Sequence, residues 1–158
     1  KLSKSDGVPV EVAPGVLLGS IGCVALQENL DAAGVTHILT VANAILPLFD
    51  GKYRYKVVSV PDAMSTNLLE VVPDCIRFVD TALASGGRVL VHCFAGKSRS
   101  TTICAAYLME KRHEPFITVL KHIRSVRPIA TPNPSFAMQL LKFQQMLGIP
   151  PATGSRDS

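Results

Sequence analysis

The sequence predicts an α/β fold in which a central, mostly parallel sheet of about five strands is flanked by helices on both faces. The first observation behind it is that short apolar segments typical of strands alternate with helical segments in the first part of the chain. The second is that the pattern from Ser100 onward is helical to the end. The third is size, because 158 residues that are 47% hydrophobic form a single domain with its own core.

The domain is predicted over residues 8–148, because the polar segments 1–7 and 149–158 are typical of flexible tails. The longest apolar runs are far shorter than a membrane span, and the first residues show no signal-peptide pattern. We therefore expect no membrane partner.

Four short segments are predicted as strands: residues 10–12, 16–18, 36–42 and 53–60. Pro14-Gly15 forms the turn between the first two. A helix over residues 24–33 is expected to stop at Gly34. A second helix follows Pro73 and ends before Gly86-Gly87, with Ile76, Val79 and Leu83 on one face.

A short strand at residues 88–91, wholly apolar after Arg88, is expected to be buried on both faces. Three helices follow it, through residues 101–111, from Phe116 until Pro128, and from Phe136 until Gly148. Two of them carry apolar faces: Phe116, Leu120, Ile123 and Val126 in one, and Phe136, Leu140, Phe143 and Leu147 in the other.

The cysteines Cys23, Cys75, Cys93 and Cys104 show neither CxxC pairs nor the density of a disulfide scaffold. A reducing compartment is therefore expected, the cytoplasm and/or the nucleus. The net charge of +4 suits an anionic partner, but the basic residues are scattered along the sequence. Nucleic acid is not expected as a partner, whereas a phosphorylated target remains open.

Residues 88–109, RVLVHCFAGKSRSTTICAAYLM, read as a buried strand, a small polar loop and an apolar helix. In such a sheet, ligands bind in the crevice beyond the carboxyl ends of the strands, where this loop emerges. Its successive backbone N–H groups, the freedom of Gly96 and the dipole of the next helix predict an anion site. Arg99 adds a planar guanidinium that matches the paired oxygens of a phosphate.

The same positive field is expected to lower the pKa of the Cys93 thiol below that of a free cysteine. A thiolate that faces a bound phosphate is a nucleophile in position. The alternative, a core cysteine, explains neither His92 nor the spacing to Gly96 and Arg99, so we favour the nucleophile. Cys75 and Cys104 are interpreted as core residues.

The pattern H-C-x-x-G-x-x-R-S at residues 92–100 resembles the signature loop of the cysteine-based protein phosphatases, and its S-R-S ending resembles their dual-specificity branch. Four other stretches resemble further parts of that domain: PGVLLGS, GVTHILTVA, VPDAMSTNLL and RPIATPNPSF. The sequence is most similar to the compact plant-type MAP kinase phosphatases, which implies a protein tyrosine phosphatase-like fold. One departure is Leu17, where the family often has Tyr, and this bears on packing.

The resemblance implies that Cys93 attacks phosphorus and carries a phosphocysteine, and that Ser100 donates to the Cys93 sulfur as it leaves. The phosphate-binding residues that it implies are Phe94, Ala95, Gly96, Lys97, Ser98 and Arg99. Neither a metal nor a cofactor is expected, because Arg99 and the amides provide the positive field.

The resemblance also makes Asp62 the general acid that protonates the leaving oxygen. An Asp after Pro is equally common in turns, so a purely structural role for Asp62 stays open. His92 is implied to position the loop by hydrogen bonding, although His92 alone would be read as a core histidine. Asn133 is implied to support the loop from the side.

Arg127 has two interpretations. A basic residue shortly before the Pro-Asn loop can lie beside the catalytic pocket in this family, so Arg127 is a candidate for binding a second phosphate of a kinase activation loop. The alternative is a solvated charge at the end of a helix.

Three function classes follow. The one we favour is a phosphatase acting on phosphotyrosine and phosphoserine or phosphothreonine, with a MAP kinase as the expected partner. The second is a phosphatase of the same chemistry that acts on a lipid, glucan or RNA phosphate. Lys97-Ser98 argues against it, because these two residues lack the pattern of the lipid and glucan members of the family. A phosphoprotein-binding module without turnover is the third, and intact Cys93, Arg99 and Asp62 argue against it.

Overall fold

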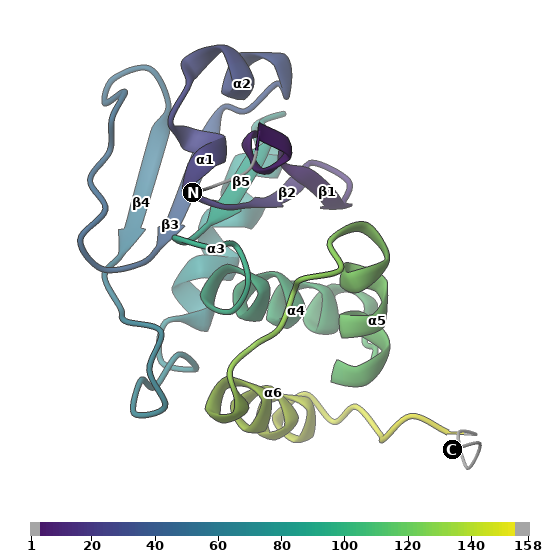
Figure 1. Cartoon of the computed structure of the whole chain (residues 1–158). Coiled ribbons are helices and arrows are strands. Elements are labelled where there is room, and N and C mark those ends of the chain that lie inside the picture. Colours follow the sequence, from purple (N-terminus) through teal and green to yellow (C-terminus); the bar gives the residue numbers. More distant parts are fainter. Residues whose placement is uncertain (1–3, 154–158) are drawn as a thin grey trace.

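The computed structural model describes residues 4–153 and is built on one five-stranded sheet (Figure 1). The strands are β1 (Val10–Ala13), β2 (Val16–Gly19), β3 (His37–Val41), β4 (Arg54–Val58) and β5 (Val89–His92), in the spatial order β1-β2-β5-β3-β4. β1 pairs antiparallel with β2, and the other pairs are parallel. The predicted mostly parallel sheet of about five strands is confirmed.

The central strand β5 positions the candidate site. All four of its residues are buried, as expected for an apolar strand covered on both faces. His92 is its last residue and lies opposite Gly19 of β2 and Thr40 of β3. Three parallel strands therefore end at the same level, and the chain after His92 leaves the sheet at its carboxyl edge.

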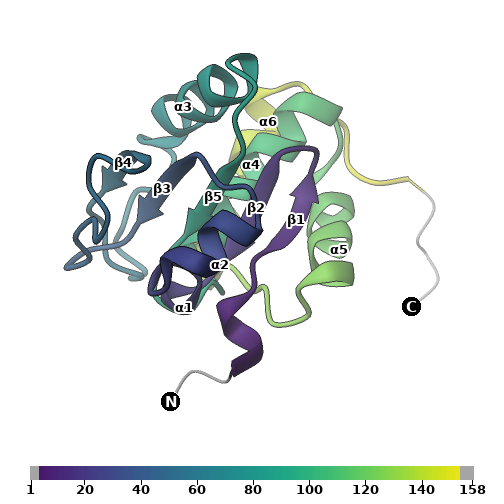
Figure 2. The ribbon, with the colours of Figure 1, turned by 90° about the horizontal axis from the view of Figure 1, so that it is seen from above.

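Helices cover both faces of the sheet, as predicted (Figure 2). The larger core contains residues of α3 (Val72–Ala84), α4 (Arg99–Arg112), α5 (Phe116–Val126) and α6 (Pro134–Met146). On the opposite face, α1 (Ile21–Val24) and α2 (Gln27–Ala32) cover a smaller core. Figure 1 shows α1 and α2 on one side of the sheet and α4, α5 and α6 on the other.

The single helix predicted over residues 24–33 is two helices, α1 and α2. Ser20 caps α1 by accepting a hydrogen bond from the N–H of Gly22, so the first helix begins before the predicted start. The backbone of Leu26 is extended, with φ −124° and ψ 119°, and this interrupts the helical path. Gly34 ends the segment with a positive φ of 72°, as its position in the sequence indicated.

Within the described residues, parts of both segments predicted as tails contact the domain. The 3-10 helix η1 (Lys4–Gly7) lies within the first, and the carbonyl oxygen of Asp6 accepts hydrogen bonds from the Ser20 hydroxyl and the Cys23 thiol. At the other end Ile149 is buried and its N–H donates to the carbonyl of Gln144. The remainder of the predicted tails, residues 1–3 and 154–158, lies outside the described residues. No helix within the described range is long and apolar enough to cross a membrane.

Candidate active site

The loop between β5 and α4 (residues 93–98), which we call the catalytic loop, places Cys93 at the carboxyl edge of the sheet. The Cys93 sulfur accepts a hydrogen bond from the N–H of Gly96 at 3.2 Å and lies 3.1 Å from the Ser100 hydroxyl oxygen. Gly96 has a φ of 64°, and a Cβ atom there would come within 2.5 Å of the Gly19 carbonyl oxygen. Only glycine fits at this position, and the sulfur lies where an anion is stabilised by two donors.

The carbonyl oxygens of four successive loop residues all point out of the loop. Their partners lie elsewhere in the chain: Ile21 N–H for Phe94, Arg127 for Ala95 and for Gly96, and Thr131 N–H for Lys97. Because each peptide unit is planar and trans, outward carbonyls turn the next N–H groups toward the inside of the loop. The loop is therefore a concavity of N–H groups, the arrangement that binds anions.

Arg99 is held by two hydrogen bonds from a single nitrogen. Its Nη1 donates to the Asn43 side-chain oxygen at 3.0 Å and to the Val60 carbonyl at 2.9 Å. Its Nε is buried and has no hydrogen-bond partner among the described residues. A buried, unpaired N–H next to the concavity is a donor for a phosphate oxygen.

His92 is a neutral residue that links the catalytic loop to the neighbouring strand. Its Nε2 lies 2.8 Å from the Thr40 hydroxyl, and its Nδ1 lies 3.1 Å from the Cys93 carbonyl oxygen. Burial lowers the pKa of His92 to about 4, which leaves the ring uncharged at neutral pH. We assign the proton to Nδ1, since a carbonyl can only accept, so that Nε2 accepts from Thr40.

Asp62 and Asn133 come together across the opening of the loop. The Asn133 side-chain Nδ2 donates to Asp62 Oδ1 at 3.0 Å, and the Asn133 backbone N–H donates to the Ser98 hydroxyl at 2.9 Å. The Asn133 Oδ1 also accepts from the N–H of Phe136 and caps α6. One residue thus connects the segment of the expected general acid, the catalytic loop and the start of a helix.

The structure brings together the site residues expected from the sequence, but it places Arg127 on the outer side of the loop. Its side chain is only 7% exposed, and it donates from Nε to the Gly96 carbonyl at 2.7 Å and from Nη2 to the Ala95 carbonyl at 3.0 Å. The same Nη2 pairs with the Asp6 carboxylate at 3.2 Å.

The interpretation of Arg127 as a solvated charge is therefore wrong, because the side chain is buried. Its Nε and Nη2 donate to carbonyls on the outer side of the loop, so these two nitrogens are not available to a second phosphate. The physical reason is the loop itself, because its carbonyls turn outward and the Gly96 carbonyl, in a buried hydrogen bond, needs a donor behind it. Arg127 supplies that donor.

Several residues that support the site were not predicted. Asn43 and Thr40 hold Arg99 and His92, as described above. Asp6 pairs with Arg127, and Gln139 of α6 accepts from the N–H groups of Leu68 and Leu69, which follow the Asp62 segment. These are isolated polar residues, and no spacing or motif in the sequence distinguishes them. Among residues 4–153, no cluster of three or more His, Cys, Asp or Glu side chains is placed to hold a metal ion.

A cysteine sulfur in an amide-lined loop, beside an arginine with an unpaired N–H, is the arrangement typical of the cysteine-based phosphatases. The family model for the dual specificity phosphatase catalytic domain matches residues 16–146, and the chain belongs to this family. It is accordingly an enzyme of the dual specificity protein phosphatase class.

Relatives and solved structures support this membership. Dual specificity protein phosphatase 1 of Arabidopsis thaliana is 42% identical over 146 residues, which cover 92% of this chain and 74% of that protein. Dual specificity protein phosphatase 1B of Arabidopsis thaliana is 41% identical over 137 residues, or 87% and 82% of the two chains. The crystal structure of human DUSP28 superposes with a TM-score of 0.83 at 34% identity, covering 89% of this chain and 95% of that one. The predicted likeness to compact plant phosphatases is confirmed.

Proposed function

We propose that the chain hydrolyses phosphotyrosine and phosphoserine or phosphothreonine in proteins through a phosphocysteine intermediate. The observation that carries the proposal is the position of the Cys93 sulfur. It accepts a hydrogen bond from the Gly96 N–H and lies beside the Ser100 hydroxyl, within the concavity of inward N–H groups. A thiolate there faces the position of a phosphate that the amides and Arg99 would hold.

In the first step the Cys93 thiolate attacks phosphorus, and the bond between phosphorus and the side-chain oxygen of the substrate breaks. Arg99 and the loop amides hold the three equatorial oxygens, whose charge persists through the transition state. Asp62 gives its proton to the departing oxygen. An alkoxide of serine or threonine leaves too slowly without that proton.

In the second step a water molecule attacks the phosphocysteine. Asp62, now ionised, takes the proton from the water, and the bond between phosphorus and sulfur breaks. Ser100 donates a hydrogen bond to the sulfur and stabilises the thiolate that departs. His92 and Asn133 act on the position of the loop and of Asp62, in line with their hydrogen bonds to Cys93, Ser98 and Asp62.

For the substrate we propose the activation loop of a MAP kinase, on the strength of the resemblance of the sequence to the plant-type MAP kinase phosphatases. The site adds nothing specific to this choice, since Arg127 does not face the pocket. For the location we propose a reducing compartment, the cytoplasm and/or the nucleus, which four free cysteines favour.

The test compares the turnover of three separate substrates: a doubly phosphorylated kinase-loop peptide, a phosphoinositide and a phosphoglucan. We expect the peptide to be hydrolysed with the highest kcat/KM. Cys93→Ser should abolish turnover and retain phosphopeptide binding, because the hydroxyl stays protonated while the anion site is intact. Cys93→Ser activity near wild type would refute the phosphocysteine, and faster turnover of the lipid or the glucan would refute the protein substrate.

A further inference from the structure

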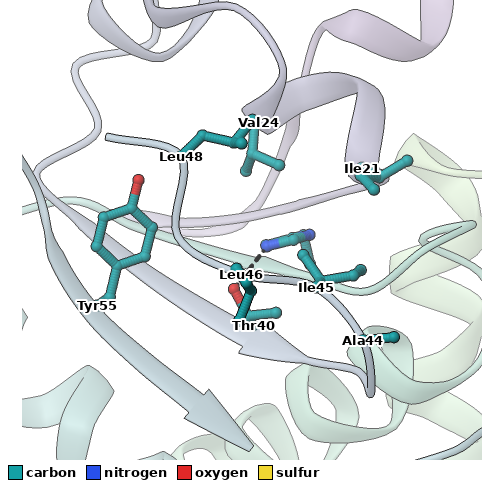
Figure 3. Close-up of a pocket in the computed structure, with 9 residues that line it drawn as sticks. Ile21, Val24, Thr40, Ala44, Ile45, Leu46, Leu48 and Tyr55 are labelled. Carbon is teal, nitrogen blue, oxygen red and sulfur yellow. Dashed lines mark hydrogen bonds between the residues drawn. The ribbon is translucent and has the colours of Figure 1, made fainter. Parts of the chain in front are cut away.

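A cavity of about 280 Å³ lies beside the catalytic loop, on the face of the sheet that α1 and α2 cover (Figure 3). Its walls are formed by Ile21 and Val24 of α1, by the β3–β4 loop (residues 42–53) and by Tyr55 of β4. Figure 3 shows the Tyr55 ring and the Ile21 side chain on opposite sides of the cavity, with Thr40 between them. The volume suffices for one large apolar side chain.

The polar groups at the floor of the cavity are already satisfied. Thr40 and His92 hydrogen-bond to each other, and His92 also donates to the Cys93 carbonyl. The Tyr55 hydroxyl accepts the N–H of Phe49. The lining formed by the described residues includes no charged side chain. Nothing here attracts a carboxylate or a phosphate, so the cavity favours an apolar group.

Two leucines of the β3–β4 loop stand at the rim and are largely in water. Leu46 is 80% exposed and Leu48 is 64% exposed, and both line the cavity. Large apolar side chains gathered around a hollow gain free energy when a further apolar group covers them.

The rim of the cavity is connected by hydrogen bonds to the catalytic loop and to Arg99. The Ile21 N–H donates to the Phe94 carbonyl at 2.9 Å. Ala44 follows Asn43, whose side chain accepts the hydrogen bond from Arg99. The cavity therefore lies next to the catalytic loop, on the side toward which the Phe94 carbonyl points.

The cavity and the general-acid segment flank the catalytic loop from opposite faces of the sheet. Asp62 is bonded to Asn133 at the start of α6, which packs on the larger core, whereas α1 packs on the smaller one. A peptide that binds its phosphate in the loop and runs from the Asp62 side toward α1 would bring a residue on one side of the phosphorylated residue to the rim of the cavity.

We propose that this cavity is a substrate subsite that receives one apolar side chain close in sequence to the phosphorylated residue. The proposal rests on the proposed action on proteins and adds a preference of the enzyme for leucine, isoleucine, methionine or phenylalanine at one flanking position.

The first experiment compares phosphotyrosine peptides that differ only by Leu or Ser at one position, on either side of the phosphotyrosine. At one position kcat/KM should be about tenfold higher for Leu, the discrimination that an apolar pocket provides. Equal values for Leu and Ser at every position would overturn the subsite while leaving the proposed function standing. Hydrolysis of p-nitrophenyl phosphate without hydrolysis of any peptide would overturn both.

The second experiment assigns the preference to the cavity. In the double variant L46S/L48S the ratio of kcat/KM for the Leu and Ser peptides should fall toward one. Ile117→Ser is the matched control, because Ile117 is an equally apolar residue, 62% exposed on α5, and does not line the cavity. Activity on p-nitrophenyl phosphate normalises each preparation for active enzyme. A preference that survives in L46S/L48S would overturn the assignment.

A third experiment observes occupation of the cavity directly. The chain has no tryptophan, so Leu48→Trp introduces a single reporter at the rim. In the Cys93→Ser background, the Leu peptide should shift the tryptophan emission to shorter wavelength, and the matched Ser peptide should not. Ile117→Trp should respond to neither peptide. Equal shifts with the two peptides at Leu48→Trp would mean that the cavity does not receive the apolar side chain, and would overturn the proposal.

Discussion

Asp62 is an exposed carboxylate that a single side chain, Asn133, holds at the edge of the catalytic loop. If it is the general acid, Asp62→Asn should lower kcat/KM for a phosphoserine peptide by about 10²- to 10⁴-fold. The loss on p-nitrophenyl phosphate should be much smaller, because its leaving oxygen needs little protonation. Steady-state kinetics on both substrates give the answer. Asp50→Asn, at another exposed loop aspartate, serves as the control, and equal losses on the two substrates would reduce Asp62 to a turn residue.

Arg127 is expected to act on the catalytic loop and not on the substrate. Arg127→Met leaves the Gly96 carbonyl, whose hydrogen bond to Arg127 is buried, and the Ala95 carbonyl without these donors, and Asp6 without its partner. We expect a loss of about 3 kcal/mol in the free energy of unfolding. We also expect a fall of about 10²-fold in kcat, because the loop amides lose their position.

The kinetic readout separates this role from the second-phosphate interpretation. Arg127→Met should lower kcat equally for mono- and bisphosphorylated peptides, and should slow alkylation of Cys93 by iodoacetate across the pH range. Asp6→Asn should show the same effects in weaker form. Lys121→Met, at an exposed residue of α5, is the control and should show neither effect. A loss confined to the bisphosphorylated peptide would contradict the assignment.

His92 should make the stability of the fold depend on pH. Its pKa is depressed from 6.5 to about 4 by burial, so the unfolded chain takes up the proton first as the pH falls. The contribution is fully present above pH 6.5 and is lost as the pH falls toward 4, about 3 kcal/mol in all. Urea unfolding at a series of pH values should show a smaller loss for His92→Gln than for wild type. His113→Gln, at an exposed histidine, is the control and should show the same pH dependence of stability as the wild type. If His92→Gln also showed the wild-type pH dependence, His92 would be excluded as the source of that dependence.

At the scale of elements, the strand, loop and helix around Cys93 form a unit whose parts are each explained locally. β5 is buried on both faces, and α4 is buried at every position from Arg99 to Met109 because the sheet lies on one side and other helices on the other. A helix buried all round needs no amphipathic pattern, which is why α4 reads as an apolar run. Its dipole is directed at the phosphate site from its N-terminus.

The other end of α4 carries a strained residue. His113 follows the helix with φ 53° and ψ 46°, the left-handed conformation in which glycine is usual. His113→Gly should therefore raise the free energy of unfolding by about 1 kcal/mol, since glycine adopts this backbone without a steric penalty. Arg112→Gly, one residue earlier and within the helix, should lower it by about 1 kcal/mol. Denaturant unfolding of the two variants should show shifts of the free energy of unfolding in opposite directions. If His113→Gly did not stabilise the protein, the backbone strain at His113 would be contradicted.

At the scale of the whole molecule, the fold buries all four cysteines but distinguishes them by their surroundings. Burial raises the pKa of Cys75 to about 12 and raises the pKa values of Cys23 and Cys104. Cys93 is as buried as the others, at 2% exposed, yet its sulfur lies among hydrogen-bond donors. Exposure alone therefore does not predict which thiol reacts.

Peroxide or iodoacetamide should accordingly modify Cys93 first in the native protein, and phosphate or vanadate should protect it. Peroxide inactivation should be reversed by a thiol reductant. In urea the four cysteines should react at similar rates, since the difference comes from the fold. Mass spectrometry of digests at successive times measures the order, and modification of Cys104 before Cys93 would contradict it.

Much of the fold could be predicted because strands and helices leave their own periodicities in the sequence. The sheet, the flanking helices and the loop from Cys93 to Ser100 follow from residues that are near neighbours along the chain. The break between α1 and α2 at Leu26 could not be predicted, since the extended conformation there depends on how the two short helices pack on the smaller core. The burial of Arg127 could not be predicted for a similar reason.

The sequence by itself determined the catalytic loop and its family. Cys93, Gly96, Arg99 and Ser100 lie within one short segment of the chain, and their spacing sets the geometry of the loop. Tertiary structure alone decided what holds that loop. Thr40 is 52 residues from His92, and Asp6 is 121 residues from Arg127. A pattern of apolar residues reports which face of an element is buried, but not which polar group lies opposite. The partners of a buried polar side chain are fixed only when the elements pack, because hydrogen bonds depend on distance and direction in space.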